Sequence, residues 1–269
     1  RYNVIVVGSD QVWNSHNLNG DDSFWLPFIN QAKGVSYAPS FGKAQLDKNE
    51  LKKIKVYLKK FSAISVREPS GAMLLSDLIP QKISVTLDPT FLLPVKRWNS
   101  ISSARLINED YILCYFMPGD KIVERTITNL AIQLSKITGK RIINIGKKEY
   151  SKLRHNADDR YDDGPLDFLS LIRNSTYVIT NSFHGTVFSI IYGKPFWVPV
   201  HKNKKDGGGF NSRIVEMLDY LALQDRIKDV DSEDNIRSEE LILNPKIYQE
   251  CLKKKVTESI KYLREALQN

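Results

Sequence analysis

The sequence predicts an α/β protein with two Rossmann-like domains, each built on a parallel sheet that helices cover. Apolar, β-branched runs alternate with amphipathic helical patterns in both halves of the chain, as in repeated strand–helix–strand units. The alternation stops at a proline-containing stretch and then resumes. The chain of 269 residues is also longer than most single cores. We therefore place an amino-terminal domain at 1–100 and a carboxyl-terminal domain at 101–269.

The amino-terminal domain begins with the apolar run VIVV, so its first predicted strand starts almost at the first residue. Since the chain opens on Arg1 without an initiator methionine, we expect this domain to be incomplete. Its predicted strands lie at 4–7, 35–38, 64–66 and 83–87, and its predicted helices lie at 47–60 and 69–78.

The stretch LDPTFLLPVKRW separates the two series of elements. Because proline lacks a backbone N–H, Pro89 and Pro94 predict a loop or linker here, and we expect the domains to join near 92–108. The strand and helix pattern then repeats in the carboxyl-terminal domain. The predicted strands are 111–116, 141–146, 177–180 and 196–200, and the predicted helices are 121–137, 165–173, 184–192 and an amphipathic stretch at 239–267.

The composition, 42% hydrophobic and 26% charged, is that of an ordinary globular protein. No apolar run is long enough to cross a bilayer, and no signal peptide is recognisable. The two cysteines, Cys114 and Cys251, predict neither a disulfide framework nor a cysteine metal site, so we expect a cytoplasmic protein. The net charge of +8 suits an anionic ligand, a nucleic acid or an anionic membrane face. Since the lysines are scattered over amphipathic helices and no nucleic-acid motif is present, we expect no nucleic-acid partner.

Polar residues follow the apolar strand YVIT and lead into a predicted helix. In an open α/β sheet this step falls at the carboxyl end of a strand, where ligands bind, and the free N–H groups of a helix start attract anions. His184 is a candidate general acid or base; the alternative is a histidine that caps the helix or is satisfied in the core. The candidate anion-binding residues around it are Asn181, Ser182, Gly185 and Thr186.

The amino-terminal domain offers a second group of candidates at strand ends. Arg67 follows a predicted strand and could hold a ligand carboxylate or phosphate; the alternative is a surface salt bridge with Glu68. Ser9, Asp10 and Gln11 follow the first predicted strand. Asp10 could accept a proton from a substrate hydroxyl, or it could cap the next helix.

Further candidates are less specific. Trp13 could offer a sugar-stacking face or could belong to the core. Lys43 and Asp88 are candidates for the same binding region. Arg213 falls in the first turn of a predicted helix, where a cation opposes the helix dipole and a compensating anion is expected. The preceding loop at 201–211, HKNKKDGGGFN, suits either a lid over an anionic substrate or a plain solvent loop.

Five motifs in this order together resemble the polysaccharide pyruvyl transferase family. They are VVGSDQVWN at 6–14, SYAPSFG at 36–42, ISVREPSG at 64–71, LDPTFLL at 87–93 and NSFHGTVFSIIYGKPF at 181–196. The resemblance implies an architecture like that of GT-B glycosyltransferases, with an active site in the cleft between two domains. It also implies transfer of the enolpyruvyl group of phosphoenolpyruvate to a sugar, closing as a pyruvate ketal. Phe183 stands immediately before His184, where many family members carry an arginine.

This chemistry can be compared with the candidate residues. Phosphoenolpyruvate presents a phosphate and a carboxylate, so its pocket needs fixed cations and backbone donors. Ketal formation needs proton transfers and a stabilised phosphate leaving group, but no metal and no cofactor. We expect Arg67, Arg213, Lys43, Asn181, Ser182, Gly185 and Thr186 to hold the donor, His184 and Asp10 to transfer protons, and Ser9, Gln11 and Trp13 to bind the acceptor.

The expected acceptor is a sugar, a nucleotide-sugar or a lipid-linked saccharide on the way to a bacterial cell-surface polysaccharide. A lipid-linked acceptor would bring the protein to the inner membrane face. Two other functions fit the same patterns. A GT-B nucleotide-sugar glycosyltransferase or epimerase would use the helix start for a pyrophosphate. A non-enzymatic sugar-binding domain of this fold is the other, and Phe183 together with the expected incompleteness of the first domain keeps it open.

Overall fold

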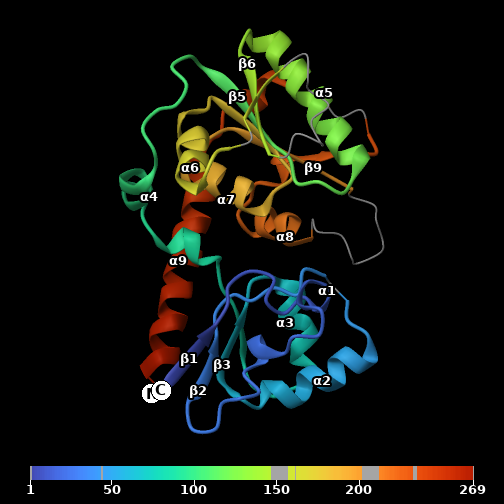
Figure 1. Cartoon of the computed structure of the whole chain (residues 1–269), viewed down its shortest axis with the longest axis vertical. Coiled ribbons are helices and arrows are strands. Elements are labelled where there is room, and N and C mark those ends of the chain that lie inside the picture. The colour runs from blue at the N-terminus through green and yellow to red at the C-terminus, as the bar shows by residue number, and fades with distance from the viewer. Residues whose placement is uncertain are drawn as a thin grey trace. The chain divides into compact units, whose positions relative to one another are not determined.

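We describe the protein from a computed structural model that describes residues 2–43, 45–146, 157–160, 162–201, 212–232 and 235–268. The chain forms two compact units, and most of their helices and several of their strands are labelled in Figure 1. Unit 1 comprises Arg1–Leu92, Lys204–Leu221 and Gln249–Asn269, and unit 2 comprises Leu93–Asn203 and Ala222–Tyr248. Unit 1 thus ends its first segment before the division predicted at residue 100, and two later segments return to it.

Within the described residues, unit 1 has a sheet of four parallel strands in the order β1-β2-β3-β4. The strands are β1 (Val4–Val7), β2 (Lys33–Ser36), β3 (Phe61–Val66) and β4 (Ile83–Val85). Strands that are consecutive in sequence are neighbours in the sheet, so each connection is a crossover. The crossovers contain α1 (Ser15–Leu18) with a 3₁₀ turn at Ser23–Trp25, then α2 (Lys48–Leu58), then α3 (Pro69–Ser76). Unit 1 also holds α8 (Ser212–Tyr220) and, from Gln249 on, α9 (Pro245–Gln268).

An aromatic cluster forms part of the unit 1 core. The ring of Trp13 stacks on Trp25 with centroids 4.4 Å apart and an interplanar angle of 9°, and Phe41 and Phe61 are its other ring neighbours. Its indole N–H donates to the carbonyl of Phe24 at 3.3 Å. Trp13 is only 2% exposed. The predicted sugar-stacking role of Trp13 is therefore wrong, because the ring is enclosed in the core of unit 1.

Unit 2 has a second parallel sheet, and its described strands follow the order β10-β9-β8-β5-β6-β7. The chain starts in the middle at β5, runs outward to β7, and then returns to build β8, β9 and β10 on the other side. The boundary between β5 and β8 is therefore a topological switch point, where ligand sites occur in such sheets. The strands are β5 (Tyr111–Tyr115), β6 (Arg141–Ile145), β7 (Ala157–Arg160), β8 (Tyr177–Thr180), β9 (Phe196–Val200) and β10 (Ile227–Asp229).

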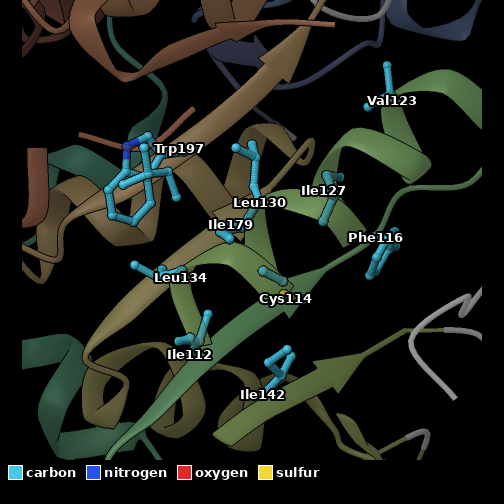
Figure 2. Packing of buried hydrophobic residues seen from close by; sticks show 12 residues of the cluster. Ile112, Cys114, Phe116, Val123, Ile127, Leu130, Leu134, Ile142, Ile179 and Trp197 are labelled. Atoms are coloured by element: carbon cyan, nitrogen blue, oxygen red, sulfur yellow. The ribbon is translucent and has the colours of Figure 1, made fainter. Parts of the chain in front are cut away.

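Helix α5 (Lys121–Thr138) covers one face of the unit 2 sheet, as Figure 2 shows. Its inward residues recur every three or four positions, which places them on one stripe of the helix. On the other face, the ring of Phe168 in α6 (Pro165–Asn174) lies edge to face with Tyr115 and with Phe188 in α7 (Phe183–Ile191). The cluster under α5 combines Val123, Ile127, Leu130 and Leu134 with Ile112, Cys114, Ile142, Ile179 and Trp197.

The stretch around the two prolines is more regular than predicted. Pro89–Leu92 forms a 3₁₀ turn, and α4 (Val95–Ile101) begins directly after Pro94, its N-cap. The loop prediction is wrong for these residues, because the missing N–H and fixed φ of proline suit a helix start. Strands β7 and β10 were not predicted, since ADDR and IKD lack an apolar run.

Two 3₁₀ turns, at Gln224–Arg226 and Ser238–Leu241, complete the described elements of unit 2. Throughout the described part of the chain, no helix has both the length and the apolar character that crossing a bilayer requires. The prediction of two parallel-sheet α/β domains is confirmed, and in each unit the carboxyl ends of the strands share one edge.

Replacing Ile127 by Ala should destabilise unit 2, because the side chain is 0% exposed and truncation leaves a cavity under α5. We expect a loss of about 2–5 kcal/mol in the free energy of unfolding, measured by urea denaturation. The matched control is Ile122→Ala on the same helix, where the side chain is 50% exposed and the expected loss is under about 1 kcal/mol. Equal losses in the two variants would contradict the packing of α5 described here.

Candidate functional site

Polar and charged residues gather where the strands of the unit 1 sheet end. Ser9 and Asp10 follow β1, Arg67 follows β3, and Asp88 comes shortly after β4. Because these strands are parallel, their carboxyl ends share one edge of the sheet. Arg213, in the first turn of α8, also contacts this edge. We call the five charged residues that meet here the arginine cluster: Asp10, Arg67, Glu68, Asp88 and Arg213.

Arg67 lies at the centre of the arginine cluster. Its Nε lies 3.1 Å from Glu68 Oε1, its Nη1 3.0 Å from Asp88 Oδ2 and its Nη2 3.2 Å from Asp10 Oδ1. Arg67, Glu68 and Asp88 are all buried, so the contact between Arg67 and Glu68 is an interior ion pair and not a surface salt bridge. Burial raises the pKa of Glu68. For Arg67, burial favours the neutral form, but the surrounding carboxylates outweigh it and raise the pKa of the guanidinium.

Asp10 is the exposed member of the arginine cluster. Its side chain is 55% exposed, and its Oδ1 also lies 3.5 Å from Arg213 Nη1, so one carboxylate oxygen lies between two guanidinium groups. Its backbone φ of 67° is in the left-handed region, which Asp adopts more readily than most residues. The N-cap of α1 is Asn14, so Asp10 does not serve as that cap. Burial and the charge of Arg67 lower the pKa of Arg213 to about 10.

Two further predicted residues border the arginine cluster. When its amide oxygen faces Arg213, Gln11 accepts from Nη1 at 3.0 Å and from Nη2 at 3.2 Å. The hydroxyl of Ser9 lies 2.9 Å from the carbonyl of Ala38 and 3.2 Å from Asp88 Oδ2. The structure therefore brings together in unit 1 the predicted residues Ser9, Asp10, Gln11, Arg67, Asp88 and Arg213.

Lys43 is engaged elsewhere in unit 1. Its ammonium lies 2.7 Å from Glu50 Oε1 in α2 and donates to the hydroxyl of Ser15 at 3.3 Å. Glu50 also accepts from the N–H of Asp47 and closes the capping box of α2. These contacts give Lys43 a part in holding the start of α2.

Helix α8 is fixed against the start of α3 by a carboxylate. Glu216 accepts from the backbone N–H of Ser70 at 2.8 Å and from its hydroxyl at 2.6 Å. A carboxylate is favourable at a helix N-terminus, where backbone N–H groups lack intrahelical partners. Since Glu216 lies one turn after Arg213, the same helix carries both the anchor and the arginine.

The polar step after β8 also forms as predicted, in unit 2. Ser182 is the N-cap of α7, and its hydroxyl accepts from the N–H of Gly185 at 3.2 Å. The hydroxyl of Thr186 donates to the carbonyl of Ser182 at 2.9 Å. A Cβ on Gly185 would lie 2.6 Å from Thr180 Oγ1, so only glycine lets α7 approach β8 this closely.

Asn181 joins the two sides of the switch point in unit 2. Its side-chain oxygen accepts from the N–H of Met117 at 2.7 Å, and its side-chain nitrogen donates to the carbonyl of Met117 at 2.7 Å. Met117 follows β5 and Asn181 follows β8, the neighbouring strands between which the chain order reverses. The amide thus fixes the spacing of two loops by neutral hydrogen bonds.

His184 lies in the first turn of α7 and is partly exposed. Its ring meets the ring of Phe183 edge to face, with centroids 5.4 Å apart. Phe183 is only 5% exposed, so the position that precedes His184 belongs to the core. Of these two neighbours, His184 is the side chain that solvent reaches.

A histidine that was assigned no role from the sequence lies between two carboxylates in unit 2. His201 Nε2 lies 2.9 Å from Asp120 Oδ2, and His201 Nδ1 lies 3.3 Å from Asp231 Oδ2. Burial opposes it, but the N–H groups of Val123 and Ile122 and the contact with His201 hold the pKa of Asp120 below its ordinary value. His201 follows β9 and Asp231 comes shortly after β10, so the strand-end criterion used for Asp10 could have found both.

The last two points concern the predicted lid and metal binding. The predicted lid at 201–211 lies, apart from His201, outside the described residues. Among the described residues, no group of three or more His, Cys, Asp or Glu side chains is arranged to hold a metal ion.

Replacing Asp120 by Asn should make the free energy of unfolding depend less on pH under acidic conditions. Because the folded pKa of Asp120 is lowered, its stabilising contribution is present above the unfolded value of about 3.9 and is lost as pH falls through the folded value. Asn still caps a helix but carries no charge. Urea midpoints between about pH 6 and pH 3 measure the slope. The control is Asp231→Asn, because Asp231 contacts the same histidine but caps no helix. It should change the slope less than Asp120→Asn does. A larger change in Asp231→Asn would contradict this account.

Comparison with known proteins agrees with the fold and adds the family. A putative UDP-N-acetylglucosamine 2-epimerase from Listeria monocytogenes superposes with a TM-score of 0.57 at 11% identity, over 99% of this chain and 75% of that one. Anabaena Alr3699/HepE, in complex with UDP and glucose, gives a TM-score of 0.53 at 11% identity, over 99% and 78% of the two chains. At such identities the likeness shows the GT-B-type fold alone.

No match was found among curated proteins. The family model described as polysaccharide pyruvyl transferase matches residues 1–200, which include both the residues after β1 and β3 and the segment from β8 into α7. The chain belongs to the polysaccharide pyruvyl transferase family.

Proposed function

We propose that this protein transfers the enolpyruvyl group of phosphoenolpyruvate to a sugar of a cell-surface polysaccharide precursor and closes it as a pyruvate ketal. Membership of the family implies a transferase. The observation that carries the proposal is the pair of buried arginines, Arg67 and Arg213, that meet at a half-exposed carboxylate in unit 1. Fixed guanidinium groups at a strand-end edge suit a donor with a carboxylate and a phosphate.

The reaction balances with general acid–base chemistry alone. A proton adds to the methylene carbon of phosphoenolpyruvate, and one sugar hydroxyl adds to the neighbouring carbon and loses its proton. The carbon–oxygen bond to phosphate then breaks, and a second hydroxyl attacks the same carbon and loses its proton. Of the two hydroxyl protons, one replaces the proton used at the methylene and one leaves with inorganic phosphate. Each proton transfer is suited to a positioned side chain, and no metal or cofactor is needed.

The residues divide into three roles in this proposal. In unit 1, donor binding is assigned to Arg67 and Arg213; in unit 2, the start of α7 with its N-cap Ser182 is assigned anion binding, because helix N–H groups favour an anion. The side chains of Asn181 and Thr186 shape that segment by their bonds to backbone groups. Proton transfer is assigned to His184 and Asp10, and acceptor binding to Ser9 and Gln11.

The acceptor is proposed as a sugar that is nucleotide-linked or lipid-linked, and the reaction as cytoplasmic. A lipid-linked acceptor would place the protein at the inner membrane face, where its net charge of +8 is favourable. Lys43 stays a proposed donor-binding residue, and its ammonium lies 2.7 Å from Glu50 Oε1.

Replacing His184 by Ala should abolish transfer and leave the fold intact, because the side chain is partly exposed and lies at the start of a helix. Loss of a general acid or base lowers turnover by about 10²–10⁴-fold. The measurement is release of inorganic phosphate from phosphoenolpyruvate in the presence of acceptor, with circular dichroism for the fold. His184→Gln keeps a hydrogen-bonding group but cannot transfer a proton, and should be equally inactive. Ordinary turnover in either folded variant would refute the role of His184.

Calorimetric titration should give saturable binding of phosphoenolpyruvate that Arg213→Gln weakens by about tenfold or more, since a charge-assisted bond is lost. Arg213 is preferable to Arg67 for this test. Removing Arg67 would leave Glu68 and Asp88 buried without their counter-charge, which destabilises a fold by about 3–5 kcal/mol. Arg264→Gln, an exposed arginine of unit 1, is the control of equal charge and should leave the affinity unchanged.

The same titration separates the other functions. Saturable binding of uridine diphosphate without binding of phosphoenolpyruvate would replace the proposal by a nucleotide-sugar glycosyltransferase or epimerase. Binding of a saccharide acceptor by a folded sample that takes up neither anion would favour a non-enzymatic sugar-binding domain.

A further inference from the structure

We propose that Asp10 is a built-in occupant of an anion subsite between Arg67 and Arg213, and that an oxyanion group of the ligand displaces it. The identity of the ligand as phosphoenolpyruvate rests on the proposed function. The geometry itself concerns only unit 1, to which all three residues belong.

The subsite is defined by the two guanidinium groups. Asp10 Oδ1 lies 3.2 Å from Arg67 Nη2 and 3.5 Å from Arg213 Nη1. Charge-assisted bonds between nitrogen and a carboxylate are usually about 2.7–2.9 Å long. All four ion-pair contacts described in the arginine cluster are longer, and the two of Asp10 are the longest, since Arg67 lies 3.1 Å from Glu68 and 3.0 Å from Asp88.

Burial differs sharply across these contacts. The side chains of Arg67 and Arg213 are 2% and 9% exposed, whereas that of Asp10 is 55% exposed. Arg67 is held independently by the buried carboxylates of Glu68 and Asp88. Arg213 is held by its burial and by the amide oxygen of Gln11, so Asp10, the exposed carboxylate of the cluster, is the group that a ligand can replace.

The charges make the two occupants exclusive. Three carboxylates already face two guanidinium groups in the arginine cluster. A ligand oxyanion added beside Asp10 would place a further negative charge within a few ångströms of it, where like charges repel.

The left-handed backbone of Asp10, with φ of 67°, is a conformation that costs an L-residue free energy and that surrounding contacts must maintain.

Displacement would also link the two substrates. While Asp10 bridges the arginines, its carboxylate is committed to them. Entry of the donor oxyanion frees that carboxylate to accept a proton from the acceptor hydroxyl. Donor binding therefore precedes productive acceptor binding in this scheme, because the base becomes available only when the donor is in place.

The test compares the affinities of Asp10→Asn and the unaltered chain for two probes, inorganic phosphate and phosphoenolpyruvate, by calorimetry. Asn is the substitution of choice because it tolerates the left-handed backbone, and Asp10→Gly is the second variant for the same reason. If Asp10 bridges the arginines in about three quarters of the molecules, its removal tightens binding about fourfold, since only the open fraction binds. Asp22→Asn removes a carboxylate from Lys53 in the same unit and controls for net charge.

The expected result is tighter phosphate and phosphoenolpyruvate binding in Asp10→Asn and Asp10→Gly, with no gain in Asp22→Asn. Measured against Arg213→Gln alone, adding Asp10→Asn to Arg213→Gln should give little or no gain, whereas general charge repulsion would give the same gain as in the unaltered chain. Unchanged or weaker binding of both probes in the folded Asp10 variants would overturn the proposal, as would a gain that survives Arg213→Gln. A gain for phosphate alone, with phosphoenolpyruvate bound by no variant, would uphold the subsite and refute the proposed donor.

Discussion

Burying a guanidinium is costly unless carboxylates compensate its charge, and Arg67 imposes that constraint on the carboxyl edge of unit 1. Three of its carboxylate partners come from the turn after β1, from the N-cap of α3 and from the turn after β4. One side chain therefore sets the relative positions of three turns that are far apart in sequence. The group that organises the edge is also the group best suited to recognise an anion, so stability and recognition share the same atoms.

Unit 2 organises the corresponding edge with neutral groups instead. The amide of Asn181 pairs with both backbone groups of Met117, and the hydroxyls of Ser182 and Thr186 bond within the start of α7. Neutral bonds of this kind fix loops without adding charge. The charged carboxylates of this edge gather instead around His201. The loops at the strand ends are thus ordered by ion pairs of Arg67 in unit 1 and by neutral hydrogen bonds of Asn181 in unit 2.

The fold was largely readable from the sequence because strands of parallel sheets are buried on both faces and so appear as continuous apolar runs. The elements that escaped lacked this signal, among them β7 with the polar residues ADDR, β10 with IKD, and α4, whose preceding proline suggested a break. For the site, the sequence predicted which residues follow strands but not which of them contact one another. That Arg67 would meet Asp10, 57 positions away, and Asp88, 21 positions away, follows from the order of strands in the sheet, which single-chain periodicity does not contain. Trp13 was ambiguous for a related reason, since an indole ring serves a core or a sugar equally well and only its surroundings decide.

Helix α9 affects the order in which the contacts of unit 1 can form during synthesis. The hydroxyl of Ser259 accepts from the backbone N–H of Leu87 at 3.0 Å, and the hydroxyl of Tyr262 donates to the carbonyl of Ser36 at 2.8 Å. Both bonds join α9 to the segment of unit 1 that precedes unit 2 in the chain. During translation, the strands of unit 1 emerge long before these partners, and all of unit 2 is made in the interval. Unit 1 therefore reaches its complete hydrogen-bonded state only after all of unit 2 has been made.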